Sequence, residues 1–131
     1  MNHEFISFYS EFLILMSEPE KLTWHKIAEL IGEIQFAPNN IACVEVAGKK
    51  ICIGKFRGQV FAFAYQCPHA GGFLDAAEID KSGNLVCPMH QYKFDMKNGR
   101  NVSGEGYYLR HWPIELRTDG IYIGMTLEAF E

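Results

Sequence analysis

Two short Cys-and-His pairs constrain the fold of this chain more than any other feature of its sequence. One residue separates Cys67 from His69, two residues separate Cys87 from His90, and residues 70–86 lie between the pairs. Thiolates and imidazoles are metal ligands, and four of them on two separate loops form a metal site by ligand type alone. The chain must therefore fold so that two loops distant in the sequence meet at one place.

A structural zinc site with two cysteines and two histidines is the alternative to a cluster. Such sites usually begin with two cysteines and end with two histidines, whereas each half of this motif carries one of each. That alternation suits a binuclear iron–sulfur cluster in which one iron takes both cysteines and the other takes both histidines. Pro68 and Pro88 each follow a cysteine and stiffen the loops. Gly71 and Gly72 allow the backbone to approach an inorganic sulfur.

The patterns Cys-Pro-His-x-Gly-Gly and Cys-Pro-x-His-x-x-x-Phe-Asp resemble the two cluster-binding loops of Rieske proteins. A looser similarity runs from about Trp24 to Tyr122. The resemblance implies one 2Fe-2S cluster per chain, bound by loops 66–73 and 86–95, with cysteines on an inner iron and histidines on an outer, solvent-facing iron. The metal- and cofactor-binding residues that it implies are Cys67, His69, Cys87 and His90.

The length and composition predict a single domain. A chain of 131 residues can bury one compact core, and a hydrophobic content of 48% with 21% charged residues is ordinary for a soluble globular protein. The net charge of −4 gives no electrostatic basis for binding nucleic acid or an anionic membrane. We expect residues 16–131 to form one Rieske-type domain.

Residues 1–15 are interpreted separately from this domain. Glu4 and Glu11 interrupt the segment, and no Lys or Arg precedes Lys21, so it does not read as a signal peptide. It is also too short to span a bilayer. We interpret it either as a mis-assigned start or as an appended helix that covers an apolar patch. No membrane anchor and a cytoplasmic location are expected.

Short strands separated by turns are expected from Trp24 onward. One helical turn is expected at residues 29–33, after the first strand. Many short strands with regularly spaced turns predict an all-β protein, an antiparallel sandwich or barrel, to which the two loops add a small cluster-binding subdomain. Aromatic side chains at 61, 63 and 65 alternate and should share one face of a strand. The expected strands are 24–28, 41–46, 50–56, 59–65, 85–86, 94–96, 114–117 and 121–123, and the expected turns are Gly48-Lys49, Arg57-Gly58, Asp80–Asn84, Asn98-Gly99 and Asp119-Gly120.

Cys43 and Cys52 lie in two of these strands, outside the motif. A turn at Gly48-Lys49 would pair Cys52 with Glu45 and leave Cys43 as a diagonal neighbour. Diagonal neighbours lie about 7–8 Å apart, beyond the usual Cα separation of a disulfide. Cytoplasmic thiols also stay reduced. Both cysteines are therefore interpreted as small buried hydrophobic residues.

Departures from relatives refine the resemblance. High-potential Rieske proteins carry an extra cysteine in each loop, where this chain has Gly72 and Met89, so the disulfide between the loops is absent. They also carry hydroxyl donors to sulfur where this chain has Tyr92 and Phe94. Fewer donors predict a low potential, near about −150 mV at the lower Rieske end. Gln91 replaces a glycine common in ferredoxins, and residues 103–107 should cover the cluster.

Two functions are consistent with this resemblance. The first is a one-electron carrier that takes electrons from a reductase and passes them to a terminal oxygenase or a similar redox enzyme. The second is a small electron-transfer or regulatory subunit of a larger reductase, similar to the small subunit of nitrite reductase. Many such subunits have lost the cluster ligands, whereas this chain keeps all four. No motif for catalysis stands out, so no enzymatic activity and no catalytic residue are expected.

Overall fold

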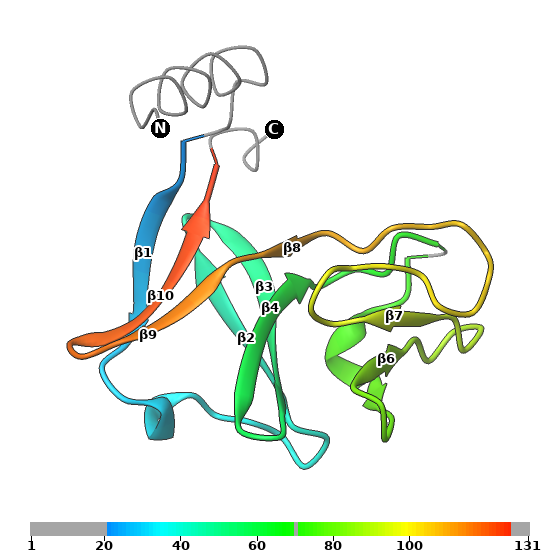
Figure 1. Cartoon of the computed structure of the whole chain (residues 1–131), viewed down its shortest axis with the longest axis horizontal. Helices are drawn as coiled ribbons and strands as arrows, with labels where there is room; N and C mark the ends of the chain where they lie inside the picture. The colour runs from blue at the N-terminus through cyan, green and yellow to red at the C-terminus, as the bar shows by residue number, and fades with distance from the viewer. Residues whose placement is uncertain (1–20, 70, 127–131) are drawn as a thin grey trace, which may run out of the picture.

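The computed structural model describes residues 21–69 and 71–126, so the expectation for residues 1–15 lies outside the described residues. The described part is built from short strands and two single 3-10 turns, which confirms the all-β class (Figure 1). No helix within it is long and apolar enough to cross a bilayer. The elements are β1 (Thr23–Ala28), β2 (Ile41–Val46), β3 (Lys49–Phe56), β4 (Gln59–Ala64), β5 (Glu78–Ile79), β6 (Asn84–Val86), β7 (Lys93–Asp95), β8 (His111–Trp112), β9 (Ile114–Arg117), β10 (Gly120–Met125), and the 3-10 turns Ile31–Glu33 and Leu74–Ala76.

The strands form three antiparallel sheets. The first has the order β1-β10-β9, the second β2-β3-β4-β8, and the third β5-β6-β7. Figure 1 shows the first two sheets together on one side of the molecule and the third standing apart from them. The chain leaves the second sheet after β4, builds the third sheet, and returns through β8, which pairs with β4. The third sheet is therefore an insertion between two adjacent strands, and it forms the expected small subdomain.

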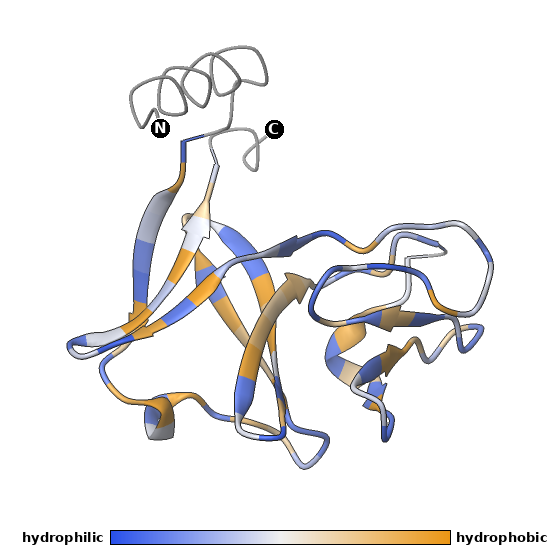
Figure 2. Ribbon diagram, viewed as in Figure 1, coloured by the Kyte–Doolittle hydropathy of each residue, from blue (hydrophilic) through white to orange (hydrophobic). Residues whose placement is uncertain are grey.

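Both faces of the central strands β3 and β4 pack into a core. Side chains alternate across a strand, and on β3 Cys52 faces one core while Ile51 and Ile53 face another. On β4, Phe63 and Ala62 divide in the same way. In Figure 2 the ribbon of these strands carries hydrophobic bands along its length. The second sheet thus lies between two hydrophobic cores and contributes side chains to both.

The two cores join the three sheets. The sheet-side core packs the second sheet against the first, and the loop-side core packs it against the third. Phe61, Phe63 and Tyr65 all contact the loop-side core, which confirms that these aromatics share a face. The sheet-side core comprises Val46, Ile51, Ile53, Val60, Ala62, Trp112, Ile123 and Met125; the loop-side core comprises Ile41, Cys52, Phe63, Cys67, Leu74, Ala77, Leu85, Cys87, Phe94, Met96 and Leu109.

The hairpin between β2 and β3 differs in register from the prediction. Val46 pairs with Lys49, so the turn is Ala47-Gly48 and not Gly48-Lys49. Both turn residues have positive φ, 53° and 81°, as a type I′ hairpin turn requires. In such turns glycine takes the second central position, as in Asn-Gly, and this preference places Gly48 second. The turn between β3 and β4 at residues 57–58 has the same form and was predicted correctly.

The corrected register overturns the expectation for the two cysteines outside the motif. Cys43 lies directly opposite Cys52, with 3.8 Å between the two Sγ atoms. Cys52 is fully buried, as expected, but Cys43 is exposed on the edge strand β2. The pairing of Cys52 with Glu45 was wrong because the turn was placed one residue too late.

The last hairpin joins β9 and β10 as predicted, but its turn also lies one residue earlier. Arg117 pairs with Gly120, which makes Thr118 and Asp119 the turn residues. β10 also pairs with β1, so this hairpin completes the first sheet. The single turn of helix predicted at residues 29–33 is present as the 3-10 turn Ile31–Glu33.

Gly99 ties the inserted subdomain to the strand that returns from it. Its φ is 72°, and a Cβ atom there would lie 2.0 Å from the carbonyl oxygen of Leu109. We expect Gly99→Ala to lower the free energy of unfolding by about 3 kcal/mol, because backbone cannot move aside cheaply and alanine is disfavoured at positive φ. Urea unfolding measures this loss. Gly32→Ala is the matched control, since no atom lies within 4 Å of a Cβ built at Gly32; equal stability of the two variants would contradict the contact.

Candidate metal centre

The first motif loop begins where β4 ends and is closed by backbone hydrogen bonds. The Cys67 N–H donates to the Gly72 carbonyl at 2.7 Å, and the Leu74 N–H donates to the Tyr65 carbonyl at 2.7 Å. Gly71 has φ of 77°, a conformation that glycine adopts without strain. These bonds bring Gly72 back beside Cys67 and Leu74 back beside Tyr65.

The second motif loop joins β6 to β7. The Cys87 N–H donates to the Tyr92 carbonyl at 2.9 Å, and the Gln91 N–H donates to the Cys87 carbonyl at 2.8 Å. Gln91 has φ of 62°, in the left-handed region. Glycine enters that region freely, whereas a glutamine there adopts an uncommon conformation.

The two loops touch at Gly72 and Met89. A Cβ atom at Gly72 would lie 2.5 Å from Met89 Cγ and 3.3 Å from Cys87 Sγ. Gly72 and Met89 are therefore neighbours in space, as the resemblance to Rieske proteins with a disulfide between these positions implies. The absence of a side chain at Gly72 lets the loops approach this closely.

The four motif residues divide by burial. Cys67 is 3% exposed and Cys87 is 0% exposed, and both belong to the loop-side core. His69 is half-buried and His90 is exposed. Their rings lie 4.8 Å apart between centroids at an interplanar angle of 65°. The two loops thus meet with both cysteines buried in the core and both histidines nearer the surface.

One atom of His69 is left without a partner. Its Nδ1 is buried, and no hydrogen-bond partner for it is present among the described residues. A buried imidazole nitrogen that forms no hydrogen bond costs free energy, so native proteins rarely leave one unpaired. A metal ion would satisfy this nitrogen, so the residues present fit a group that binds there.

Among the residues that the structure describes, no three His, Cys, Asp or Glu side chains gather around one point. A tetrahedral zinc ion needs four ligands around one point. A binuclear iron–sulfur cluster of the type inferred from the motif needs only one pair of protein ligands on each iron.

Two tyrosines surround His69. The Tyr92 ring lies 4.1 Å from the His69 ring and the Tyr107 ring lies 5.4 Å from it, with 5.9 Å between the two tyrosines. Partial burial raises the pKa of Tyr92, and the nearby Glu105 carboxylate adds to this shift, so Tyr92 remains a neutral phenol at pH 7. Tyr107 confirms that the 103–107 segment reaches the histidine end.

A polar network holds that segment in place. Asn101 Oδ1 accepts hydrogen bonds from the N–H groups of Glu105 at 2.6 Å and Gly106 at 3.0 Å. The Lys93 N–H donates to Ser103 Oγ at 2.8 Å, which ties the segment to β7. Hydrogen bonds from Ser103 and Asn101 lower the pKa of Glu105, so it stays charged. Asn101 was not predicted from the sequence, although an Asn before a Gly-rich segment is a signal of side-chain-to-backbone bonding.

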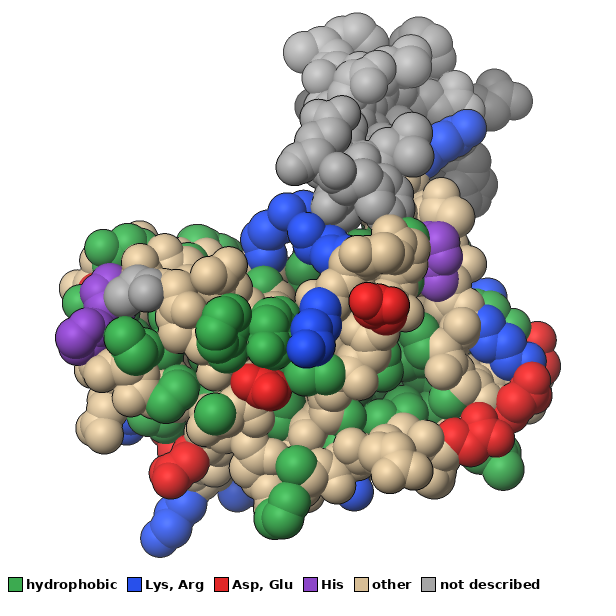
Figure 3. All heavy atoms as spheres, turned by 180° about the vertical axis from the view of Figure 1, so that it is seen from behind, with side chains coloured by type: hydrophobic (Ala, Val, Ile, Leu, Met, Phe, Trp, Pro, Cys, Tyr) green, Lys and Arg blue, Asp and Glu red, His purple; other side chains and the backbone are tan. Residues whose placement is uncertain are grey.

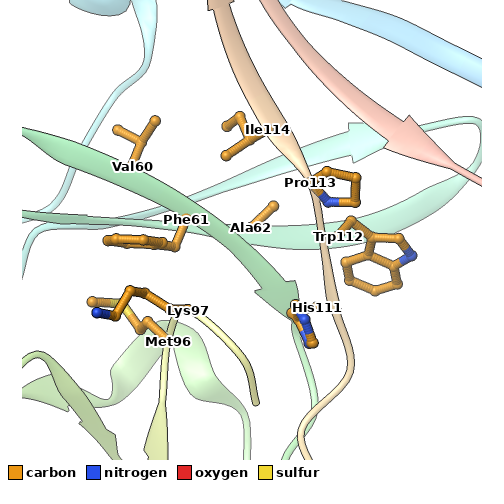
Figure 4. A pocket seen from close by; sticks show the side chains of 9 residues that line it. All are labelled: Val60, Phe61, Ala62, Met96, Lys97, His111, Trp112, Pro113 and Ile114. Atoms are coloured by element: carbon orange, nitrogen blue, oxygen red, sulfur yellow. The ribbon is translucent and has the colours of Figure 1, made fainter. Parts of the chain in front are cut away.

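A separate surface groove of about 350 Å³ lies between the second sheet and the segment after β7 (Figure 4). In Figure 4, Met96 and Lys97 lie on one side of it, and His111 and Trp112 lie on β8. None of the four motif residues lines this groove. The motif residues belong to the loops of the inserted subdomain, and Figure 3 shows histidine side chains at the surface of the molecule beside hydrophobic ones.

Known proteins similar to this chain include an oxygenase subunit and a ferredoxin component. The chain is 34% identical over 79 residues to the oxygenase subunit of glycine betaine monooxygenase from Pseudomonas aeruginosa, a match over 53% of this chain and 18% of that protein. It is 22% identical over 107 residues to the ferredoxin component of the naphthalene 1,2-dioxygenase system of the same species, covering 77% of this chain and 97% of the relative. The chain thus spans less than a fifth of the oxygenase subunit that it matches.

Solved structures share the fold at low identity. The ferredoxin of carbazole 1,9a-dioxygenase from Nocardioides aromaticivorans IC177 superimposes with a TM-score of 0.65 at 20% identity, covering 77% of this chain and 96% of that one. A protein described as an NADH-dependent nitrite reductase small subunit from Mycobacterium tuberculosis superimposes with a TM-score of 0.66 at 16% identity, covering 80% of this chain and 96% of that one. The Rieske [2Fe-2S] domain model matches residues 24–108, which include both motif loops. The chain belongs to the Rieske [2Fe-2S] domain family, and its cofactor is a 2Fe-2S cluster.

Proposed function

We propose that this chain is a one-electron carrier that takes electrons from a reductase and delivers them to a terminal oxygenase or a similar redox enzyme. The observation that carries the proposal is the division of the motif residues, with Cys67 and Cys87 buried and His90 exposed. Electron transfer to a docked protein needs an exposed edge on a group that is otherwise shielded from water.

The ligand set is part of this proposal. Cys67 and Cys87 would hold one iron from within the loop-side core, and His69 and His90 would hold the other. The unpaired, buried Nδ1 of His69 supports its role as a ligand. When bound, the cluster stores a single electron, and its neutral imidazole ligands raise its potential above that of clusters with four cysteines. The surrounding protein excludes water from the sulfur side.

The surface around the histidines supports docking of a protein partner. Several large hydrophobic side chains lie exposed on the two motif loops and on the segment held by Asn101. Contact with a partner would remove this apolar surface from water. The relatives favour an oxygenase as partner, since one is the ferredoxin component of a dioxygenase system and another structure is a complex of an oxygenase with a ferredoxin. The exposed side chains are Phe73, Met89, Val102, Tyr107 and Tyr108.

On this proposal the chain is not itself an enzyme, and it has no catalytic residue. The alternative is a small electron-transfer or regulatory subunit of a larger reductase, which the likeness to the nitrite reductase small subunit favours. The two proposals differ in the partner: a carrier exchanges electrons with separate proteins, whereas a subunit stays bound to one. A cytoplasmic location fits either.

Metal analysis combined with electron transfer tests the proposal. We expect about two irons and two acid-labile sulfides per chain and a rhombic EPR signal after reduction. The protein should also pass electrons from NADH and a flavin-dependent ferredoxin reductase to cytochrome c. His90→Ala should abolish the rhombic signal, whereas His111→Ala on β8, outside the two loops, should keep it. One zinc and no sulfide would overturn the proposal; a cluster that is reduced only within a stable complex with a large partner would favour the subunit.

Gly72 tests the packing of the two loops. Gly72→Ala should reduce the iron retained per chain, because its Cβ would lie 2.5 Å from Met89 Cγ and press on the loop that carries Cys87. Adding Met89→Ala removes that Cγ and should restore most of the iron. Iron retention measured on single and double variants gives the coupling between the two positions. Failure of the second substitution to restore any iron would contradict the contact.

Phe94 tests the prediction of a low potential. Phe94 is 0% exposed and belongs to the same core as Cys67 and Cys87. Phe94→Tyr should raise the midpoint potential by about 40 mV, since a hydrogen bond of about 1 kcal/mol to a ligand sulfur favours the reduced state. Protein-film voltammetry measures the shift. Phe36→Tyr, on the opposite side of the second sheet, is the control; an equal shift in both variants would contradict a specific bond at residue 94.

A further inference from the structure

A second pair of cysteines lies outside the motif, on the edge of the second sheet. Cys43 and Cys52 are both free thiols, directly opposite each other on β2 and β3, with 3.8 Å between their Sγ atoms. The proposed electron carrier uses neither of them. The chemistry open to this pair does not depend on the proposed function.

The backbone geometry at the pair suits a disulfide. The two-residue turn makes Val46 and Lys49 a hydrogen-bonded pair, and the pairs alternate along the hairpin, so Cys43 and Cys52 form a non-hydrogen-bonded pair. The Cα atoms of such pairs lie about 4.5 Å apart, within the disulfide range of about 4.4–6.8 Å. A bond between the two sulfurs therefore needs side-chain rotation and little movement of the strands.

The two thiols differ in access to solvent. Cys43 is exposed because β2 is the edge strand, whereas Cys52 is 0% exposed and packs in the loop-side core with Phe63. Burial raises the pKa of Cys52, and the neighbouring Cys43 adds to the shift, so Cys52 remains a thiol. An oxidant in solution can therefore reach Cys43, whereas Cys52 is shielded from it.

We propose that Cys43 and Cys52 form a redox modification site that hydrogen peroxide oxidises to a reversible disulfide. The Cys43 thiolate attacks one peroxide oxygen, the O–O bond breaks, and hydroxide leaves, which gives a sulfenic acid. The Cys52 sulfur then attacks the Cys43 sulfur, the S–S bond forms, the S–O bond breaks, and water leaves with the Cys52 proton. Two thiols and one peroxide become one disulfide and two waters.

The arrangement protects Cys43 from irreversible damage. A sulfenic acid without a nearby thiol proceeds to sulfinic acid, which thiols do not reduce. Cys52, with its sulfur 3.8 Å from that of Cys43, is placed to capture the sulfenic acid, and a dithiol reductant can restore both side chains. The disulfide also ties the edge strand β2 to β3, whose other neighbour is β4.

Peptide mapping of the holoprotein tests this proposal. After treatment with hydrogen peroxide at a level that leaves the visible spectrum of the cluster unchanged, remaining thiols are alkylated and the protein is digested with trypsin. Lys49 and Lys50 lie between the cysteines, so trypsin separates them, and only a disulfide joins the two peptides. We expect the joined peptides, and their loss after dithiothreitol. Cys43 found as a sulfenic or sulfinic acid with Cys52 still alkylatable, or both thiols left unreacted, would overturn the proposal.

Cys52→Ala gives the matched variant. Without the second thiol, the sulfenic acid at Cys43 should persist, so that its labelling by dimedone rises about tenfold over that of the unsubstituted chain. Equal labelling in both proteins would show that Cys52 captures nothing and would also overturn the proposal. If the variant does not fold, the peptide map of the unsubstituted protein still decides. Cluster content is read separately by iron and sulfide analysis, so a failure of the proposed carrier function is not confused with a failure here.

Discussion

The alternation of side chains along β3 and β4 is the constraint on which the rest of the molecule depends. Because successive residues of a strand face opposite ways, one sheet contributes Ile51 and Ile53 to one core and Cys52 and Phe63 to the other. The first sheet closes the sheet-side core, and the inserted third sheet closes the loop-side core. Without a second sheet that is apolar on both faces, the inserted subdomain would have nothing to pack against.

The loop-side core also sets the orientation of the two motif loops. Cys67 and Cys87 are part of this core, whereas the histidines of the same loops lie nearer the surface. Backbone hydrogen bonds close each loop, and the missing side chain at Gly72 lets the loops meet. As a result, the cysteine side of the motif is shielded from water and the histidine side is accessible to it. A protein that exchanges electrons across its surface needs this arrangement.

The edge of the same sheet carries the second pair of thiols. Cys52 faces the loop-side core that holds the motif cysteines, yet its direct partner across the hairpin is the exposed Cys43. Two kinds of cysteine chemistry therefore lie on one side of the second sheet, one inside the inserted subdomain and one at the sheet edge. Their separation lets a peroxide reach the edge pair without passing through the metal centre.

The sequence by itself determined the family, the all-β class and the two loops. The spacing of the Cys and His residues and the positions of Pro and Gly are properties of short segments, so they can be recognised without the tertiary structure. It also predicted β4 and its shared aromatic face from a period of two residues. Strand register was decided only by the tertiary structure, since a single-residue error at Ala47-Gly48 changed every partner in the hairpin. The contact of Tyr107 with His69 could not be predicted from the sequence either. The position of this loop depends on side chains such as Asn101, whose hydrogen bonds fold the chain back on itself. Local chemistry can be read along the chain, whereas register and loop placement depend on contacts between residues far apart in it.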